Sequence, residues 1–342
     1  MKPWQFLIAL SLILSLSVPF YAGGWEALQA FGQLSWWAMG TLIGLMVVSW
    51  SVQATRIHFL ARVLGRGLKP HQALGTTVAA EFGHAATPGG TGGPGTYLFL
   101  LTRQGLSVDE ALAIQAVDQS TDLVFFATAV PLALLLHALD IGNRQSIGVA
   151  LLVALLVLIG LWFLIWLLGH YRRVVLFLGR LINRLPRLHR ARYRLARFII
   201  RFRRSVRILI TMGPVRLLIL YLLSVCYWVP RYSVLPVLFA YLGLEGDFAY
   251  LFLVQLLVLV AGQLTLLPGG GGGVELGYTA VMRTYLSAGV AASTLLLWRF
   301  ATLYFTLIAG LPVFLLMTGS HAREIIAKRG PEEAAGRDAA RR

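Results

Sequence analysis

Thr87-Pro88-Gly89-Gly90-Thr91-Gly92-Gly93-Pro94-Gly95 is a glycine-rich stretch with an early proline, and it lies inside a hydrophobic region of the chain. A second stretch, Leu267-Pro268-Gly269-Gly270-Gly271-Gly272-Gly273-Val274-Glu275, lies inside another hydrophobic region, and its proline follows the first by 180 positions (268 − 88). Helix-breaking sequence is tolerated at membrane depth only where protein or a water-filled cavity surrounds it. A matched pair of such breaks in two halves of a chain is typical of a transporter site between two repeats.

The composition of the chain is that of a membrane protein. Of its 342 residues, 58% are hydrophobic and only 13% are charged, whereas about a quarter of the residues of soluble domains are charged. Several apolar runs reach the roughly 20 residues that a helix needs to cross a bilayer. The sequence therefore predicts an all-α polytopic membrane protein.

The formal net charge of +16 would suggest a nucleic-acid partner in a soluble chain. Here the arginines lie between apolar runs, so the preference of basic residues for the cytoplasmic side explains them better, and we expect no nucleic-acid partner. Cys226 is the only cysteine, which excludes an intrachain disulfide and a cysteine-rich metal site.

Apolar runs and charges together predict about six transmembrane helices and two re-entrant helical hairpins. The hairpins should cover 73–101 and 248–285, because each contains a glycine-rich loop and leaves two arms too short to span the bilayer. This arrangement places both termini in the cytoplasm and lets one hairpin enter from each side, as in an inverted repeat. The six spans are expected at about 4–21, 34–54, 111–137, 147–168, 215–242 and 290–317.

We expect a single membrane domain over residues 1–320 and a basic, disordered cytoplasmic tail over 321–342. Within the domain, the first repeat should run from about 34 to 137 and the second from about 214 to 317, with a basic cytoplasmic loop over 171–207 between them. The expected location is the cell (inner) membrane.

Two segments leave alternatives open. The connection 171–207 contains thirteen arginines and no acidic residue, and arginines recur every three or four positions from Arg190 to Arg204. It is either an amphipathic helix on an anionic leaflet or a loop that only follows the positive-inside rule. The apolar run after Lys2 is either the first span or a cleaved signal peptide, and the span fits the charge pattern better.

The two glycine-rich loops are the first candidates for a binding site. Glycine permits positive φ angles and proline removes a donor, so short helices that meet there expose backbone groups at membrane depth. A half-helix N-terminus of this kind favours an anionic group such as phosphate. The alternative is tight helix packing, for which small residues are also chosen. The predicted substrate-binding residues in the loops are Pro88, Gly89, Gly90 and Gly92 in the first and Pro268, Gly269, Gly270 and Glu275 in the second.

Ionisable residues inside apolar runs are the second group of candidates, because they are costly in a membrane and mark functional sites by default. Glu81, Asp118 and Asp122 are the candidates for carrying a coupling proton or ion. Arg299 occupies the position that a shift of 180 gives to Gln119, and we expect it to pair with Asp118 or Asp122. A purely structural ion pair is the alternative.

Arg231 lies near the middle of a predicted span. It should either pair with Glu81 or Glu275 or receive an anionic headgroup. Arg231 and Arg299 therefore complete the predicted set of substrate-binding residues.

Catalytic signatures are absent from the sequence. There is no His-Glu-x-x-His and no Gly-x-Ser-x-Gly, and the G-x-G-x-x-G pattern from Gly90 to Gly95 contains a proline and follows no strand. Two carboxylates one helical turn apart, Asp118 and Asp122, are weak evidence for a metal. We therefore predict no catalytic residue, no cofactor and no resident metal.

Four pieces of the sequence together resemble a known family: Thr87-Pro88-Gly89-Gly90-x-Gly, Gln119-x-x-Asp122, Leu267-Pro268-Gly269-Gly270-x-Gly-x-Val274-Glu275, and Arg299. They are similar to the lysylphosphatidylglycerol synthase transmembrane-region family, also called flippase-like, and the similarity covers nearly the whole chain. The resemblance implies a helical fold with two re-entrant segments and a role in moving or handling phospholipids.

The chain departs from this family in two respects. Bifunctional members continue into a soluble aminoacyl-transferase domain, for which this chain has no room, so we do not expect it to synthesise aminoacyl lipids alone. Where the family pattern has Glu-Arg, this chain has Asp118-Gln119. Half of the family's arginine pair is therefore missing.

The combined expectation is a translocase for a phospholipid or a lipid-linked intermediate, which binds an anionic headgroup between the two loops. Two alternatives stay open: a membrane-embedded transferase that modifies a lipid, and a non-transporting scaffold of a lipid-modifying complex. The expected partners are membrane lipids with anionic headgroups and a lipid-modifying enzyme. The identity of the lipid, the direction of movement, the coupling ion and the oligomeric state do not follow from the sequence.

Overall fold

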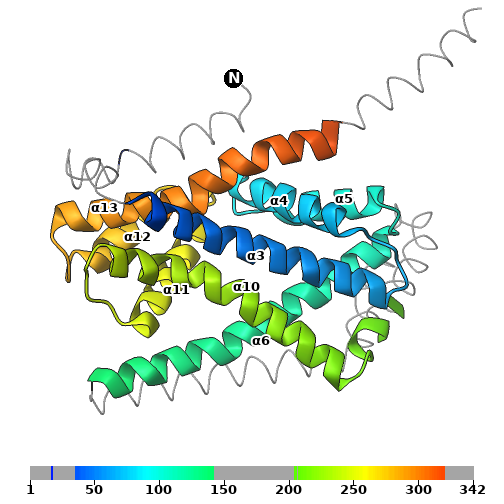
Figure 1. Ribbon diagram of the computed structural model, residues 1–342, viewed down its shortest axis with the longest axis horizontal. Coiled ribbons are helices and arrows are strands. Elements are labelled where there is room, and N and C mark those ends of the chain that lie inside the picture. The colour runs from blue at the N-terminus through cyan, green and yellow to red at the C-terminus, as the bar shows by residue number, and fades with distance from the viewer. Residues whose placement is uncertain (1–16, 18–34, 142–203, 206, 320–342) are drawn as a thin grey trace, which may run out of the picture.

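The computed structural model describes residues 17, 35–141, 204–205 and 207–319 (Figure 1). Helices dominate these residues, and no strand occurs among them. The helical elements are α3 (Trp36–Val63), α4 (Pro70–Ala86), α5 (Gly92–Arg103), α6 (Val108–Ile141), α10 (Pro214–Tyr241), α11 (Phe248–Leu264), α12 (Gly273–Met282), α13 (Ala288–Arg299) and the π-helical turn η2 (Phe300–Tyr304).

Four of the described helices are long and apolar enough to cross a membrane: Trp36–Val63, Val108–Leu139, Pro214–Tyr241 and Ala288–Gly319. The predicted all-α fold with several candidate spans is confirmed by this part of the chain. The predicted spans at 4–21 and 147–168 and the predicted tail lie outside the described residues, as does most of the predicted basic loop.

The two halves of the chain contain the same elements in the same order. Helices α3 and α10 have 28 residues each, and α4 and α11 have 17 residues each. In each half, the 17-residue helix is followed by a glycine-rich loop, a short helix (α5 or α12) and a second long helix. At 1.5 Å per residue α4 extends about 25 Å, which is at the short end of what a transmembrane helix needs.

Side-chain contacts show which helix ends lie together. Arg66, which follows α3, forms a salt bridge of 2.8 Å with Glu110 in the first turn of α6. At the same end, Arg103 at the end of α5 donates a hydrogen bond of 2.6 Å to the carbonyl of Met317. We call this the basic end of the molecule, and the pair α4–α5 begins and ends there.

The opposite end gathers the other helix termini. The hydroxyls of Thr41 in α3 and Tyr241 in α10 lie 3.0 Å apart. The rings of Tyr250 in α11 and Tyr285 after α12 have centroids 5.1 Å apart. The pair α11–α12 therefore begins and ends at this opposite end, and Figure 1 shows α4 and α5 on one side of the molecule and α11 and α12 on the other.

The tips of the two helix pairs meet. Pro88 and Pro268 form an isolated antiparallel bridge, and Pro268 is buried. Gly89 and Gly90 have φ angles of 58° and 70°, and Gly269 has 61°. Only glycine adopts this left-handed region without a steric penalty, so these residues permit the tight turns at both tips.

A threonine closes each tip at an equivalent position. The Oγ1 of Thr87 donates a hydrogen bond of 2.7 Å to the carbonyl of Gly83 and accepts one of 2.7 Å from the N–H of Gly92. Thr265 donates in the same way to the carbonyl of Gly262 at 2.7 Å. These bonds satisfy backbone groups that the break between the two helices would otherwise leave unpaired.

Helix α10 contains two prolines, and its neighbour α11 compensates for one of them. Pro236 lacks an N–H, so the carbonyl of Tyr232 loses its usual helical partner. The buried amide of Gln255 in α11 donates a hydrogen bond of 2.8 Å to that carbonyl. This hydrogen bond fixes the proline-containing part of α10 against α11.

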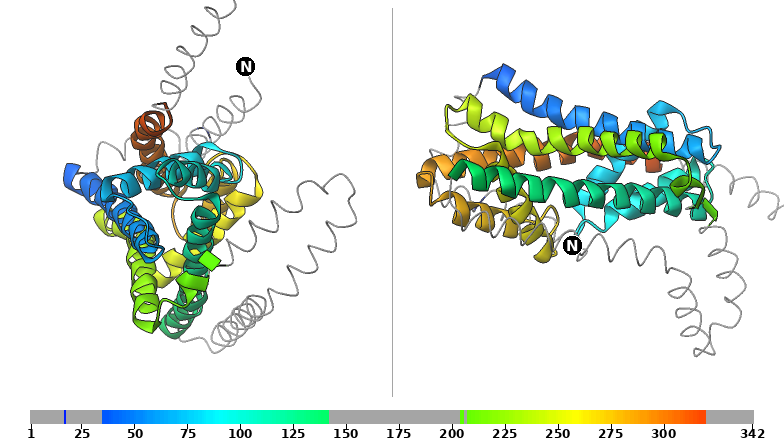
Figure 2. Two further views of the ribbon diagram at one scale, coloured as in Figure 1. Left: turned by 90° about the vertical axis from the view of Figure 1, so that its right-hand side faces the viewer. Right: turned by 90° about the horizontal axis from the view of Figure 1, so that it is seen from below.

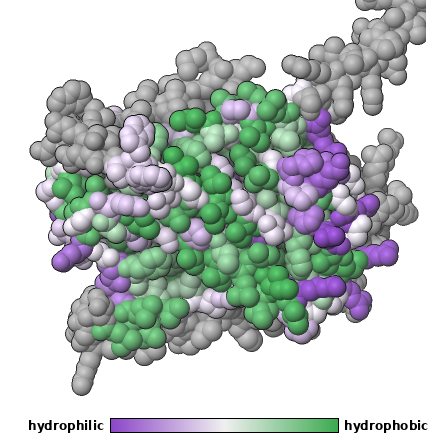
Figure 3. Space-filling view, viewed as in Figure 1, coloured by the Kyte–Doolittle hydropathy of each residue, from purple (hydrophilic) through white to green (hydrophobic). Residues whose placement is uncertain are grey.

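The surface is apolar over much of its middle, as Figure 3 shows for one face. Large hydrophobic side chains are exposed on α6, α10 and the last helix, among them Leu132, Leu136, Leu218 and Leu316. A soluble monomer rarely exposes so large a patch, whereas a bilayer solvates it.

Candidate functional site

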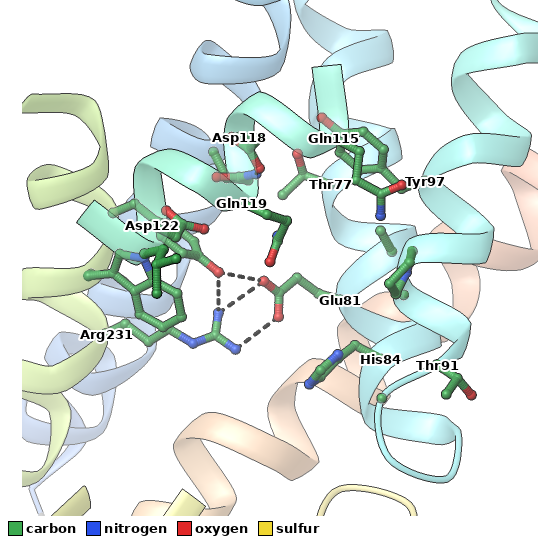
Figure 4. A pocket seen from close by; sticks show the side chains of 18 of the residues that line it. Thr77, Glu81, His84, Thr91, Tyr97, Gln115, Asp118, Gln119, Asp122 and Arg231 are labelled. Atoms are coloured by element: carbon green, nitrogen blue, oxygen red, sulfur yellow. Dashed lines mark hydrogen bonds and ion pairs between the residues drawn. The ribbon is translucent and has the colours of Figure 1, made fainter. Parts of the chain in front are cut away.

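A cavity of about 640 Å³ opens among α3, α4, α5, α6 and α10, and we call it the chamber. Seen along the long helices, α3, α10, α6 and the pair α4–α5 are arranged in a ring (Figure 2). Figure 4 shows the polar side chains that project into the space between them. The lining consists of Gln53 from α3; Thr77, Ala80, Glu81 and His84 from α4; Gly89, Gly90, Thr91, Gly93, Pro94 and Tyr97 from the first loop and α5; Gln115, Asp118, Gln119, Asp122, Leu123 and Phe126 from α6; and Tyr227, Trp228 and Arg231 from α10.

Glu81 and Arg231 form a two-pronged ion pair across the chamber. The guanidinium donates to both carboxylate oxygens, at 3.0 and 2.9 Å, and the hydroxyl of Tyr227 donates to one of them at 2.9 Å. The guanidinium also lies 5.7 Å from the Tyr227 ring centre and 6.0 Å from that of Trp228. Paired charges with added hydrogen bonds are the form in which ions are tolerated away from water. The side chains of Arg231 and Glu81 keep 23% and 14% of their surface exposed, so both remain accessible from the chamber.

A second ionic cluster forms the wall between α3 and α6. The guanidinium of Arg56 lies 2.8 Å from a carboxylate oxygen of Asp118 and 2.8 Å from one of Asp122. Gln53 donates to Asp118 at 2.7 Å, and Ser224 in α10 donates to Asp122 at 3.0 Å. The cluster joins three helices and contains two carboxylates for one guanidinium.

Sequence reasoning missed Arg56. It placed the span at 34–54, so Arg56 fell just outside it, whereas α3 continues to Val63 and the Arg56 side chain is fully buried. The usable signal was the spacing of Ser49, Gln53 and Arg56, which puts three polar residues on one helical face.

The predicted pairing of Arg299 with Asp118 or Asp122 is wrong. Arg299 lies 2.7 Å from the carboxylate of Glu275 and donates a hydrogen bond of 2.8 Å to the carbonyl of Gly269. All of these groups belong to the second half, where only a short connection separates α12 from α13. The aspartates of the first half are paired with an arginine of their own half instead.

The predicted site residues fall into two groups. Glu81, Gly89, Gly90, Asp118, Asp122 and Arg231 line the chamber, and Pro88 and Gly92 lie next to its lining. The second-loop residues Pro268, Gly269, Gly270 and Glu275, together with Arg299, do not line it. On their side of the molecule, the side chains of the Arg299–Glu275 pair are 3% and 0% exposed. The chamber is therefore built from the first half and α10, and the two loops do not enclose it symmetrically.

The N-terminus of α5 does not present free donors to the chamber. The N–H of Gly92 is bonded to Thr87, the N–H of Gly93 donates to the carbonyl of Gly90 at 3.1 Å, and Pro94 has none. These N–H groups already have partners within the protein, so they are not available to bind an anion as the sequence predicted. Part of the glycine content of the loop is explained by helix packing, because a Cβ at Gly93 would meet the Cβ of His84 at 2.9 Å.

The formal charges around the chamber do not favour an anion. Glu81, Asp118 and Asp122 carry three negative charges, and Arg56 and Arg231 carry two positive ones. Both arginines are committed to carboxylates. Among the described residues, no group of three histidine, cysteine or acidic side chains is arranged to hold a metal ion.

With this geometry established, the chain can be compared with known proteins. The model of the family described as the lysylphosphatidylglycerol synthase transmembrane region matches residues 8–310. The chain belongs to this family. It is also 23% identical over 273 residues to a protein of Archaeoglobus fulgidus described as a UPF0104 membrane protein, covering 78% of this chain and 82% of that one. Membership in the family and the apolar helices together identify a multi-pass membrane protein of a family linked to lipid handling.

Proposed function

We propose that the protein translocates a phospholipid or a lipid-linked intermediate across the inner membrane, with the headgroup in the chamber and the acyl chains in the bilayer. The observation that carries this proposal is the chamber itself, a polar cavity in a chain whose surface is apolar and whose family handles lipids. Polar residues at membrane depth are retained where they face a pathway or a water-filled cavity.

The meeting of the two tips supports an alternating mechanism. In the proposed topology, α4–α5 and α11–α12 are re-entrant hairpins of an inverted repeat and enter from opposite faces of the membrane. The basic end, with Arg62, Arg66 and Lys69, lies in the cytoplasm by the positive-inside rule. Rocking of one half against the other about the Pro88–Pro268 contact would expose the chamber to one leaflet at a time.

In this mechanism, an anionic headgroup binds by displacing the Glu81 carboxylate from Arg231. The phosphate replaces Glu81 as the partner of Arg231, and Glu81 takes up a proton, so that the number of charges in the chamber is conserved. Asp118 and Asp122 share one guanidinium and are the further candidates for a coupling proton. The exchange keeps the charge paired at each step, which a low-dielectric site requires.

Reconstitution into liposomes tests this function directly. Purified protein should increase the movement of fluorescent phospholipids between leaflets, measured by chemical quenching of the outer leaflet. Arg231→Gln should reduce this movement at least tenfold, because the phosphate loses its partner. Arg66→Gln is the matched control: this arginine is also paired with a glutamate, but it lies at the basic end, outside the chamber.

Two results would assign other functions. If no phospholipid tested moves between leaflets, the result would favour the alternative function, a non-transporting scaffold of a lipid-modifying complex. Formation of a covalent product from labelled donor and lipid would instead identify a transferase that uses the chamber carboxylates.

A further inference from the structure

Several polar groups of the chamber wall lack a partner. The hydroxyl of Tyr97 is buried and forms no hydrogen bond, and the residue is only 6% exposed. Within the described part of the chain, the side chains of Gln115 and Gln119 also form no hydrogen bond, although both line the chamber. Buried polar groups in proteins are almost always satisfied, so the Tyr97 hydroxyl indicates a bound molecule that supplies its missing partner. Gln115 is half-buried and Gln119 is exposed, so both amides are available to the same molecule.

These groups face the chamber from two sides. Gln115 and Gln119 are one turn apart on α6 and therefore project from the same face. Tyr97 comes from α5, and in the view of Figure 4 the three side chains lie above the Glu81–Arg231 pair. A ligand that lies between Arg231 and Tyr97 would pass both amides.

Aromatic rings flank the same space. Phe126, Tyr227 and Trp228 line the chamber, and the rings of Phe126 and Trp228 have centroids 4.7 Å apart. The indole Nε1 of Trp228 is buried and has no partner. Aromatic faces provide apolar contact for the C–H faces of a ring, and an indole N–H adds one more donor.

The chemistry of the wall matches hydroxyl groups better than additional charge. A hydroxyl donates one hydrogen bond and accepts two, so it complements an amide, a phenol and a carboxylate at once. An additional anion would meet three carboxylates whose two arginines are already committed. A neutral ring of hydroxyls would satisfy the free groups and leave both ion pairs intact.

We propose that the chamber selects a headgroup rich in hydroxyls, such as a polyol or sugar ring, carried by a membrane lipid. The proposal rests on the proposed function, because it names the class of lipid that the same chamber takes. The volume of about 640 Å³ lies within the range of roughly 300–1,000 Å³ that is typical of small-molecule sites. The ring contacts Gln115, Gln119 and Tyr97, and any phosphate that links it to the lipid lies near Arg231.

Binding to detergent-solubilised protein tests the proposal with four short-chain lipids. Dioctanoyl phosphatidylinositol has a phosphate and a polyol, and a dioctanoyl glucosylglycerol has a sugar without phosphate. Dioctanoyl phosphatidic acid has only the phosphate, and dioctanoyl phosphatidylcholine is the non-hydroxylated comparison. We expect the first two to bind at least tenfold more tightly than phosphatidic acid. Equal or tighter binding of phosphatidic acid would overturn the proposal.

The two hydroxylated lipids separate the possible sources of affinity. Equal affinity of both would assign recognition to the ring alone, and preference for the inositol lipid would assign it to ring and phosphate together. Either result supports the proposal.

Gln119→Leu and Tyr97→Phe should each weaken binding of the hydroxylated lipids by about 2–10-fold, the effect of one net hydrogen bond. Binding of phosphatidic acid should not change.

Gln263→Leu is the matched control, because Gln263 is exposed on α11 outside the chamber lining. If this control weakens binding as much as Gln119→Leu does, the amides of the chamber have no special role and the proposal fails. The liposome assay separates this failure from that of the translocase. Tight binding of hydroxylated lipids without movement would refute translocation alone, whereas equal movement of phosphatidylinositol and phosphatidic acid would refute the headgroup selection alone.

Discussion

Pro88 and Pro268 lie side by side in an antiparallel bridge although 180 positions separate them in the chain. Each is the first helix-breaking residue at the tip of a helix pair, and the two pairs start from opposite ends of the molecule. The contact joins the two halves at the centre of the fold. In the proposed mechanism it is the point about which the halves move.

Cross-linking the tips should stop movement without preventing binding. Opposed residues of an antiparallel pair have Cα atoms about 4.5–5.5 Å apart, which is within the range of about 4.4–6.8 Å that a disulfide spans. Pro88→Cys with Pro268→Cys, in a Cys226→Ser background, should form a disulfide that mass spectrometry detects. The oxidised protein should bind lipid but move it at least tenfold more slowly, and a reductant should restore movement. Full movement in the cross-linked protein would show that the tips need not separate.

The Glu81–Arg231 pair should show energetic coupling. Arg231→Gln or Glu81→Gln alone should lower the free energy of unfolding by roughly 1–3 kcal/mol, because one charge remains without its hydrogen-bonded partner. The partial exposure of both side chains keeps the loss below that of a fully buried pair. The double substitution should cost less than the sum of the single ones in a double-mutant cycle on thermal unfolding. Strict additivity would contradict the pairing.

Arg56 should contribute more to stability than any exposed arginine. Arg56→Gln leaves Asp118 and Asp122 buried without compensation, which should cost about 3–5 kcal/mol. Adding Asp118→Asn should recover part of this loss, because it removes one uncompensated charge. Arg62→Gln, six residues further along α3 and exposed, is the control and should change stability by less than about 0.5 kcal/mol. Similar losses for both arginines would contradict a special role for Arg56.

The loop glycines should differ sharply in their tolerance of a side chain. Gly269 has a φ of 61°, and a Cβ there would meet the side chain of Leu303 at 2.6 Å, so Gly269→Ala should destabilise by at least about 1–2 kcal/mol. Gly95 lies in α5 with nothing within 4 Å of an added Cβ. Gly95→Ala should therefore be neutral or stabilising by up to about 1 kcal/mol. Thermal unfolding of the two variants distinguishes strain at the tip from a general demand for small residues.

The opposite entry of the two helix pairs can be tested in sealed vesicles. Single cysteines at Lys69, before α4, and at Tyr285, after α12, should react with an impermeant maleimide from opposite sides. Both residues are exposed. The Cys226→Ser protein without added cysteine gives the background. Labelling of both positions from the same side would refute the inverted topology.

Much of the architecture followed from the sequence. The apolar runs predicted helical spans, and four long apolar helices are present among the described residues. The two glycine loops predicted matched breaks, and each loop does join a helix of 17 residues to a shorter one. Such features are local, because hydrophobic length and the conformational range of glycine and proline act over a few neighbouring residues.

The sequence offered Glu81 as one of the alternative partners of Arg231, but the partners of Arg299 and Arg56 did not follow from it. Arg299 was expected beside the aspartates of α6 on the basis of a uniform shift of 180, but α3 and α10 begin 178 positions apart (214 − 36). In the structure, Arg299 pairs with Glu275, and Asp118 pairs with Arg56. Sequence reasoning had placed Arg56 just outside the predicted span. A shift of two positions turns a helical side chain by about 200°, so sequence register alone could not place these partners.

By itself, the sequence determined that the chain is helical and apolar and breaks at two equivalent tips, since each of these properties depends on residue type and local spacing. Only the tertiary structure decided that the tips touch, that Arg231 pairs with Glu81, and that the chamber is lined by the first half and α10. Those outcomes depend on which faces of distant helices meet, and a buried charge takes whichever opposite charge the packing brings within hydrogen-bonding distance.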